Sequence, residues 1–82
     1  RTDALRAQVE QAVRALYPAV TRHDFRVVWG VTHSNVVFDV AVPFAEEDSD
    51  ETVSRRIGEA VAGLDPKYRA VVTVDRGGTD VA

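Results

Sequence analysis

The sequence contains no cysteine, and only three of its 82 residues are proline. Without cysteine the chain has neither a disulfide nor a thiolate metal site to support its fold. No run of apolar residues approaches the ~18 needed to span a membrane, and no signal peptide is visible. A core of this size buries only about 60% of the surface that the unfolded chain exposes. A metal ion or a second copy of the chain therefore remains as a candidate support.

Basic residues are also few, and they are scattered. Ten Lys and Arg stand against 13 Asp and Glu, which gives a formal net charge of −3. Because the basic residues do not cluster on any segment, a nucleic-acid surface is not expected. An acidic balance suits cations or a protein partner slightly better. With 45% hydrophobic and 28% charged residues the chain has the composition of one folded domain.

The known catalytic motifs are missing as well. The chain has no G-x-S-x-G turn, no P-loop and no HExxH helix. Thr73 and the serines have no general base placed near them by spacing. We therefore do not expect an enzyme. A small-molecule sensor or a free-standing enzyme of ferredoxin-like architecture is the weakest interpretation that remains.

Two segments have the apolar spacing of amphipathic helices. In residues 3–17 the apolar side chains recur at helical intervals. The second helix follows the acidic stretch "AEEDSD", where Asp48 and Glu51 have the spacing of a capping box. It runs to about residue 62, with Gly63 placed to close it. The acidic stretch could instead hold Ca²⁺ or Mg²⁺ weakly, but it lacks the spacing of a calcium-binding loop.

Three further segments read as strands, namely residues 23–29, 35–42 and 69–75. The first two form a hairpin across "GVTHS", which is longer than a two-residue turn. Since strand–helix–strand units are right-handed, the third strand should lie parallel to the second. The sequence therefore predicts an α+β sandwich in α-β-β-α-β order, with a three-stranded mixed sheet and two helices on one face.

The other face of this sheet is half apolar and half charged. We expect a partner to cover it, because the core is small. Val28 and Val37 are candidates for a dimer interface together with Trp29, whose N–H needs a partner if it is buried. The side chains expected on this face are Asp24, Arg26, Val28, Val37, Asp39, Ala41, Val71, Thr73 and Asp75.

One histidine and three acidic residues should converge at one end of this face. His23 and Asp24 begin the first strand, beside the ends of the second and third strands. Asp39 and Asp75 lie on those strands, so all four can approach one another. Histidine with carboxylates suits Zn²⁺ and similar divalent ions. His33 lies in the loop at the opposite end, roughly 20 Å away at ~3.3 Å per residue, so it would belong to a separate site.

Each of these side chains also has an ordinary explanation. Asp24 or Asp39 opposite Arg26 could form a cross-strand ion pair. Asp75 could be a solvated charge at a strand end. His33 in a loop is more often solvated than bound to metal. No fixed ligand spacing such as CxxC strengthens the metal interpretation.

The stretch "HDFRVVWGVTHSNVVFDVAVPF", followed by a helix and "LDPKYRAVVTVDR", resembles the C-terminal cytoplasmic domain of cation diffusion facilitator transporters. The resemblance is to a bacterial branch and covers nearly the whole chain. It implies a metallochaperone-like fold. It also implies that residues 1–82 are a single regulatory and dimerisation domain, cut from a longer membrane transporter. Such transporters export divalent cations, typically Zn²⁺, Mn²⁺, Fe²⁺ or Co²⁺.

The resemblance also implies partners and ligands. The domain would form a homodimer on the cytoplasmic side of the bacterial inner membrane, attached to the membrane domain of the same transporter. His23, Asp39 and Asp75 match positions that bind metal in the family, whereas Thr73 stands where zinc-binding members have a histidine. This departure favours a carboxylate-rich site, completed by the second protomer or by water. The alternative is a purely structural dimerisation module without metal.

Overall fold

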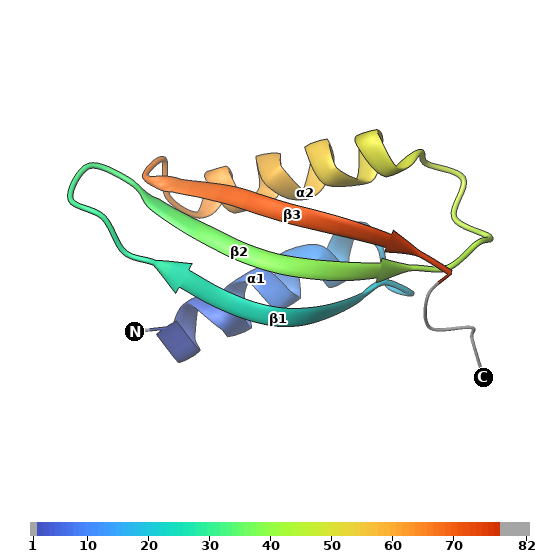
Figure 1. Cartoon of the computed structure of the whole chain (residues 1–82), viewed down its shortest axis with the longest axis horizontal. Coiled ribbons are helices and arrows are strands. Elements are labelled where there is room, and N and C mark those ends of the chain that lie inside the picture. Colours follow the sequence, from blue (N-terminus) through green and yellow to red (C-terminus); the bar gives the residue numbers. More distant parts are fainter. Residues whose placement is uncertain (1, 78–82) are drawn as a thin grey trace.

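The computed structural model describes residues 2–77. Its elements are α1 (Thr2–Leu16), β1 (Thr21–Val28), β2 (Ser34–Val42), α2 (Asp50–Leu64) and β3 (Tyr68–Arg76). Figure 1 shows the strands as one layer with both helices behind it. The expected α-β-β-α-β order is confirmed, and each boundary lies within about three residues of its expected place.

The three strands lie in the order β1-β2-β3, with β2 in the centre. β1 pairs antiparallel with β2, and β3 pairs parallel with β2, as expected for a hairpin followed by a crossover through α2. The end of β2 therefore lies between the start of β1 and the end of β3. This end of the sheet, where β2 and β3 end and β1 begins, carries the acidic residues discussed below.

The core lies between the sheet and the two helices. Alternate residues of β2, from Val36 to Val42, point toward the helices and are fully buried. α1 and α2 meet them with apolar stripes at helical spacing, which is how an amphipathic helix buries one face. The buried helical side chains are Leu5, Val9, Val13, Val53, Ile57 and Val61. Each such side chain stabilises the fold by about 1.5–3 kcal/mol relative to exposure.

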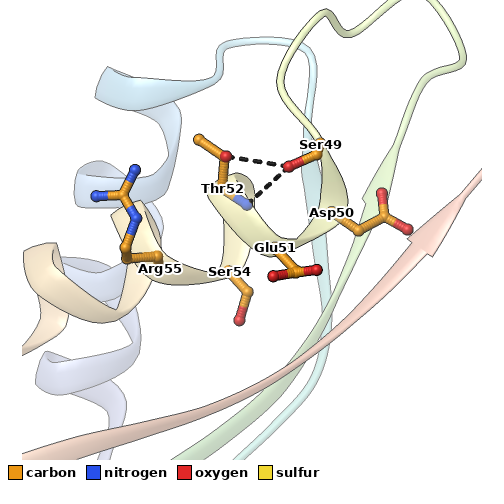
Figure 2. Close-up of a pocket in the computed structure, with 6 residues that line it drawn as sticks. All are labelled: Ser49, Asp50, Glu51, Thr52, Ser54 and Arg55. Carbon is orange, nitrogen blue, oxygen red and sulfur yellow. Dashed lines mark hydrogen bonds between the residues drawn. The ribbon is translucent and has the colours of Figure 1, made fainter.

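Both ends of α2 differ from the expectation. Ser49, not Asp48, is the N-cap: its Oγ accepts the backbone N–H of Thr52 at 3.2 Å (Figure 2). The Asp48 carboxylate is instead bound by Tyr17, which directly follows α1, and by Arg56 of α2. At the other end the helix passes through Gly63 and stops at Leu64. Asp65 is extended there because it precedes a proline, so the proline ends the helix and the glycine does not.

β1 contains a bulge that the alternation of its sequence does not predict. His23 pairs with Asp39 and Arg26 pairs with Val37, so two residues of β1 face the single residue Phe38. Asp24, the first of the two, has a φ of 55°, in the left-handed region. Aspartate tolerates this region better than most side chains. The bulge moves His23 to the face of the sheet that the helices leave uncovered, hereafter the outer face.

Candidate metal site on the outer face of the sheet

Both helices lie behind the sheet in Figure 1, so within residues 2–77 no helix packs against the outer face, to which all three strands contribute residues. Val28 is 56% exposed and Val71 is 47% exposed, both large fractions for valines in a sheet. Val37 is the register partner of Val71 on one side and of Arg26 on the other, and it is half-buried. Val28 is opposite Asn35, one outer-face position earlier on β2. Apolar side chains in a row on an uncovered sheet face are typical of a surface that a partner covers.

Trp29 lies apart from these valines. Its ring meets Tyr68 edge to face at 6.3 Å, and its indole N–H donates to the Thr2 hydroxyl at 3.4 Å. It packs against the core beside the start of α1. The indole thus has the partner that burial requires. Its place in a dimer interface stays a prediction.

One hollow of about 400 Å³ lies on the outer face where β2 and β3 end and β1 begins. His23 and Asp39 are register partners, and Asp39 is level with Thr73 on β3. Asp75 is one outer-face position further along β3. The residues that line the hollow are His23, Asp24, Asp39, Val40, Ala41, Thr73, Val74 and Asp75. The structure therefore places the four side chains expected to converge around one space.

The donors of this hollow have suitable chemistry for a divalent cation, but one copy of the chain does not assemble them. Imidazole nitrogen and carboxylate oxygen are ligands for Zn²⁺ and related ions. Within residues 2–77, however, no group of three or more His, Asp or Glu side chains is arranged to hold a metal ion. One copy thus supplies an incomplete ligand set.

The carboxylates of the hollow are not neutralised by arginine. None of the ion pairs in the described part of the chain involves Asp24, Asp39 or Asp75. Arg26 is paired in the register with Val37, so the cross-strand ion pair considered from the sequence does not form. The hollow therefore gathers carboxylates that no arginine or lysine of residues 2–77 pairs with.

The two histidines lie at opposite ends of the β1–β2 hairpin, as expected. His33 is exposed in the loop between these strands, and its Nδ1 lies 3.2 Å from the hydroxyl of Thr32. His23 has a similar neighbour, since its Nε2 lies 3.1 Å from the hydroxyl of Thr21. A role of His33 as a separate metal ligand stays a prediction.

Arg76 is a structural residue that the sequence did not reveal. Its guanidinium donates to the backbone carbonyls of Pro43, Glu46 and Asp48 at 3.2, 3.0 and 2.6 Å, and to the Asp50 carboxylate at 2.8 Å. The end of β3 thereby holds the loop that enters α2. These oxygens are directed at a cationic side chain, which argues against the calcium site considered for this loop. From the sequence, the third strand is expected to end at residue 75, which leaves Arg76 outside it.

A second cluster fixes the same loop from the side of the helices. The Tyr17 hydroxyl donates to Asp48 Oδ2 at 2.6 Å, and Arg56 donates to the same oxygen at 3.2 Å. The hydrogen bond from Tyr17, assisted by Arg56, lowers the pKa of Asp48. Burial, and the hydrogen bond to Asp48, raise the pKa of Tyr17. The cluster lies away from the outer face and holds the loop between β2 and α2 in place through Asp48.

Scans of the sequence against protein-family models and against curated proteins give no significant match. Solved structures do match over nearly the whole chain. The metal-bound C-terminal domain of the CzcD transporter from Thermotoga maritima superimposes with a TM-score of 0.72 at 18% identity, covering 95% of this chain and 94% of that chain. The chain has the fold of transporter C-terminal domains.

Two other structures give the same result. CzrB, a candidate zinc transporter, has a TM-score of 0.71 at 20% identity, with 93% of this chain and 92% of that chain covered. The copper form of a MamM C-terminal domain variant has a TM-score of 0.71 at 15% identity, covering 93% and 98%. All three are cation diffusion facilitators, so the resemblance found in the sequence extends to the fold. Within residues 2–77 no helix is long and apolar enough to cross a membrane.

Proposed function

We propose that this chain is the cytoplasmic domain of a cation diffusion facilitator, and that it forms a homodimer whose stability depends on a divalent cation. The observation that carries the proposal is the hollow on the outer face, which collects His23, Asp39 and Asp75 on a fold shared with a metal-bound transporter domain. Neither carboxylate forms an ion pair with an arginine within residues 2–77. A cation is the counter-charge that the hollow lacks.

The mechanism follows from charge. Two copies that meet through their outer faces bring four carboxylates, from Asp39 and Asp75 of each copy, toward one another. Like charges in a partly dehydrated interface repel strongly, since the effective dielectric constant there is far below that of water. A cation bound between the copies turns this repulsion into attraction and adds the ligands that one copy lacks. It thus favours the closed dimer by its differential affinity for that state.

The donor set narrows the identity of the cation to a class. It contains imidazole and carboxylate but no thiolate, which suits Zn²⁺, Mn²⁺, Fe²⁺ and Co²⁺. In the whole transporter, a cation-dependent angle between the two copies would report the cytoplasmic concentration of the transported ion to the membrane domain. No catalytic role is part of the proposal.

Titration of the 82-residue chain with Zn²⁺ and Mn²⁺ tests the proposal. At a hundred times the dissociation constant, a cation that binds only the folded chain stabilises it by about 2.7 kcal/mol, which thermal unfolding detects. The double variant His23→Ala/Asp75→Ala should lose the stabilisation by Zn²⁺ and Mn²⁺. His33→Ala should keep the stabilisation that comes from an ion bound in the hollow. If neither Zn²⁺ nor Mn²⁺ changes the melting temperature, the light scattering or the fluorescence of Trp29, the proposed control of the dimer by a cation is wrong.

The second candidate is a structural dimerisation module that needs no ion. It is favoured by one observation, namely that no three-ligand group is assembled within residues 2–77. In that case the chain dimerises equally well with and without EDTA. Replacement of His23 and Asp75 by alanine would then strengthen the dimer by removing charge, whereas the metal hypothesis requires the opposite at saturating Zn²⁺.

A further inference from the structure

The bulge of β1 lies beside the hollow and has a specific geometric effect. Asp24 is the one residue other than glycine with a positive φ among residues 2–77. Two residues, Asp24 and Phe25, occupy the space opposite Phe38. Alternation along a strand is strict, so a single inserted residue reverses the side to which every earlier side chain points.

The bulge determines to which face of the sheet the side chains of Arg22 and His23 point. Arg22 pairs with Val40 and turns toward the helices, where its side chain is only 11% exposed and Nη2 lies 3.1 Å from Oε1 of Glu10. Its guanidinium also covers the ring of Phe25 at 5.0 Å. His23 pairs with Asp39 and turns to the outer face. Without the bulge, the arginine would point to the hollow and the histidine toward the core.

The ring of His23 has a further contact on its own strand. Thr21 is two residues earlier on the same face, and its Oγ1 lies 3.1 Å from Nε2 of His23. Histidines that bind metal commonly donate the N–H of the other ring nitrogen to a fixed acceptor, which sets both tautomer and orientation. A threonine hydroxyl can serve as that acceptor.

We propose that Asp24 and Thr21 are positioning residues for His23. The left-handed backbone at Asp24 turns the imidazole into the hollow. The Thr21 hydroxyl accepts the Nε2–H, which leaves Nδ1 as the nitrogen available to a cation. Asp24 acts through its backbone conformation, and its carboxylate is not a required ligand. The inference rests on the proposed cation site and names the residues that aim one of its ligands.

The first test needs no metal. The variant Asp24→Gly keeps access to the left-handed region, whereas Asp24→Val and, more mildly, Asp24→Ala oppose it. NMR of the metal-free chain should show contacts between the His23 ring and Asp39 in the parent and in Asp24→Gly. These contacts should weaken in Asp24→Ala and disappear in Asp24→Val. Arg26→Val, on the same strand outside the bulge, should keep them. Full retention in Asp24→Val and Asp24→Ala would overturn the role of the bulge.

The second test measures the tautomer of His23 and the affinity for Zn²⁺ separately. Nitrogen shifts of the imidazole should show the proton on Nε2 of His23, and a proton on Nδ1 would overturn the role of Thr21. In Zn²⁺ titrations, Asp24→Gly should bind within ~3-fold of the parent, while Asp24→Val and Thr21→Val should bind ~10–100-fold more weakly. Thr32→Val removes the equivalent hydroxyl beside His33 and is the matched control.

The outcomes distinguish the two proposals. If Asp24→Gly loses Zn²⁺ as completely as Asp24→Val, the carboxylate itself is a ligand and the positioning role is wrong. If the parent binds no Zn²⁺ or Mn²⁺, the proposed function fails. The NMR contacts and the tautomer then still decide whether Asp24 and Thr21 aim His23.

Discussion

Single residues determine how the chain leaves the end of the sheet at which the hollow lies. Gly77 follows β3 with a φ of 72°, and its N–H donates to the carbonyl of Val42 at 2.8 Å. The residue is buried under the ring of Phe44, which is itself 70% exposed. A side chain at this position would meet both an unfavourable backbone conformation and the aromatic ring. Only glycine satisfies both conditions.

Gly77→Ala should therefore destabilise the fold by about 1–3 kcal/mol, measured by urea unfolding. The added Cβ would overlap the ring of Phe44. Gly58→Ala is the matched control, because a Cβ there meets nothing within 4 Å and lies inside α2. It should stabilise the fold by roughly 0.5–1 kcal/mol. The double variant Gly77→Ala/Phe44→Ala should regain only the part of the lost unfolding free energy that comes from the overlap of the Cβ with the ring. Equal effects of the two glycine substitutions would contradict this account.

The hydrogen bond from Tyr17 to Asp48 should make stability depend on pH. The pKa of Asp48 is lowered in the folded chain, mainly by this bond. The ionised carboxylate therefore favours the folded state above the pKa of the unfolded chain. That contribution is lost as pH falls from about 5 through the depressed pKa. Tyr17→Phe should lower the thermal midpoint by a few degrees at pH 7, and the difference should shrink in acid.

Tyr68→Phe is the control for that experiment, because it removes a hydroxyl that makes no hydrogen bond within residues 2–77. Its thermal midpoint should follow that of the parent at every pH. A Tyr17→Phe difference that stays constant from pH 7 to pH 3 would assign the effect to packing and not to Asp48.

At the scale of elements, the loop between β2 and α2 is fastened from two sides, by Arg76 on β3 and by the Tyr17 cluster. The Arg76 side chain is 22% exposed, so its bonds to backbone carbonyls are partly shielded from water. Its ion pair to Asp50 contributes less, because that carboxylate is 54% exposed. The loop is thus ordered by a planar donor that reaches several acceptors at once.

Arg76→Lys should consequently cost about 2 kcal/mol, since one ammonium cannot replace the fork of donors. Hydrogen exchange should increase in residues 43–50 before it increases elsewhere. Arg55→Lys is the control, because the ion pair that Arg55 forms in the described part of the chain is with Glu59 at 3.5 Å, and both side chains are exposed. Unchanged exchange in residues 43–50 would show that the Tyr17 cluster alone holds the loop.

The elements themselves could be predicted from the sequence because their signals are periodic. The apolar spacing of α1 and α2 and the valine-rich strand around Phe38 fix which faces are buried, and hence the layers of the fold. The places of Asp39 and Asp75 in the hollow follow from the same argument, since topology alone puts them at one end of the sheet, whereas the face to which His23 points depends on the bulge of β1.

Features that break a period could not be predicted in this way. "HDF" continues the alternation of β1 on paper, so the bulge at Asp24 leaves no trace in the pattern. The choice between Asp48 and Ser49 as N-cap depends on Tyr17, which lies 31 residues away in the chain. The acceptors of Arg76 are backbone carbonyls, which no side-chain pattern records. The structure was needed wherever tertiary contacts compete with a local signal.

At the scale of the whole molecule, one large surface of the sheet is left for a partner. Helices cover one side. The other carries Val28 toward one end, Val37 and Val71 in the middle, and at the other end carboxylates that form no ion pair within residues 2–77. A second copy would bury the valines, and a cation would relieve the carboxylates. Apolar contact and charge therefore act through different residues of the same face and can be tested separately.

Val28→Asp and Val71→Asp should each weaken the dimer at least ~10-fold, because each places a charge among apolar side chains that the second copy buries. Sedimentation velocity at several protein concentrations, with Zn²⁺ and with EDTA, measures the effect. Val31→Asp is the control: Val31 is fully exposed at the tip of the β1–β2 loop, off the sheet. Because Val28 is opposite Asn35, two outer-face positions from Asp39 in the hollow, Zn²⁺ should still bind to the Val28→Asp variant. If Val31→Asp weakens the dimer as much as Val28→Asp, the copies meet through the loop end and the outer face is not the interface.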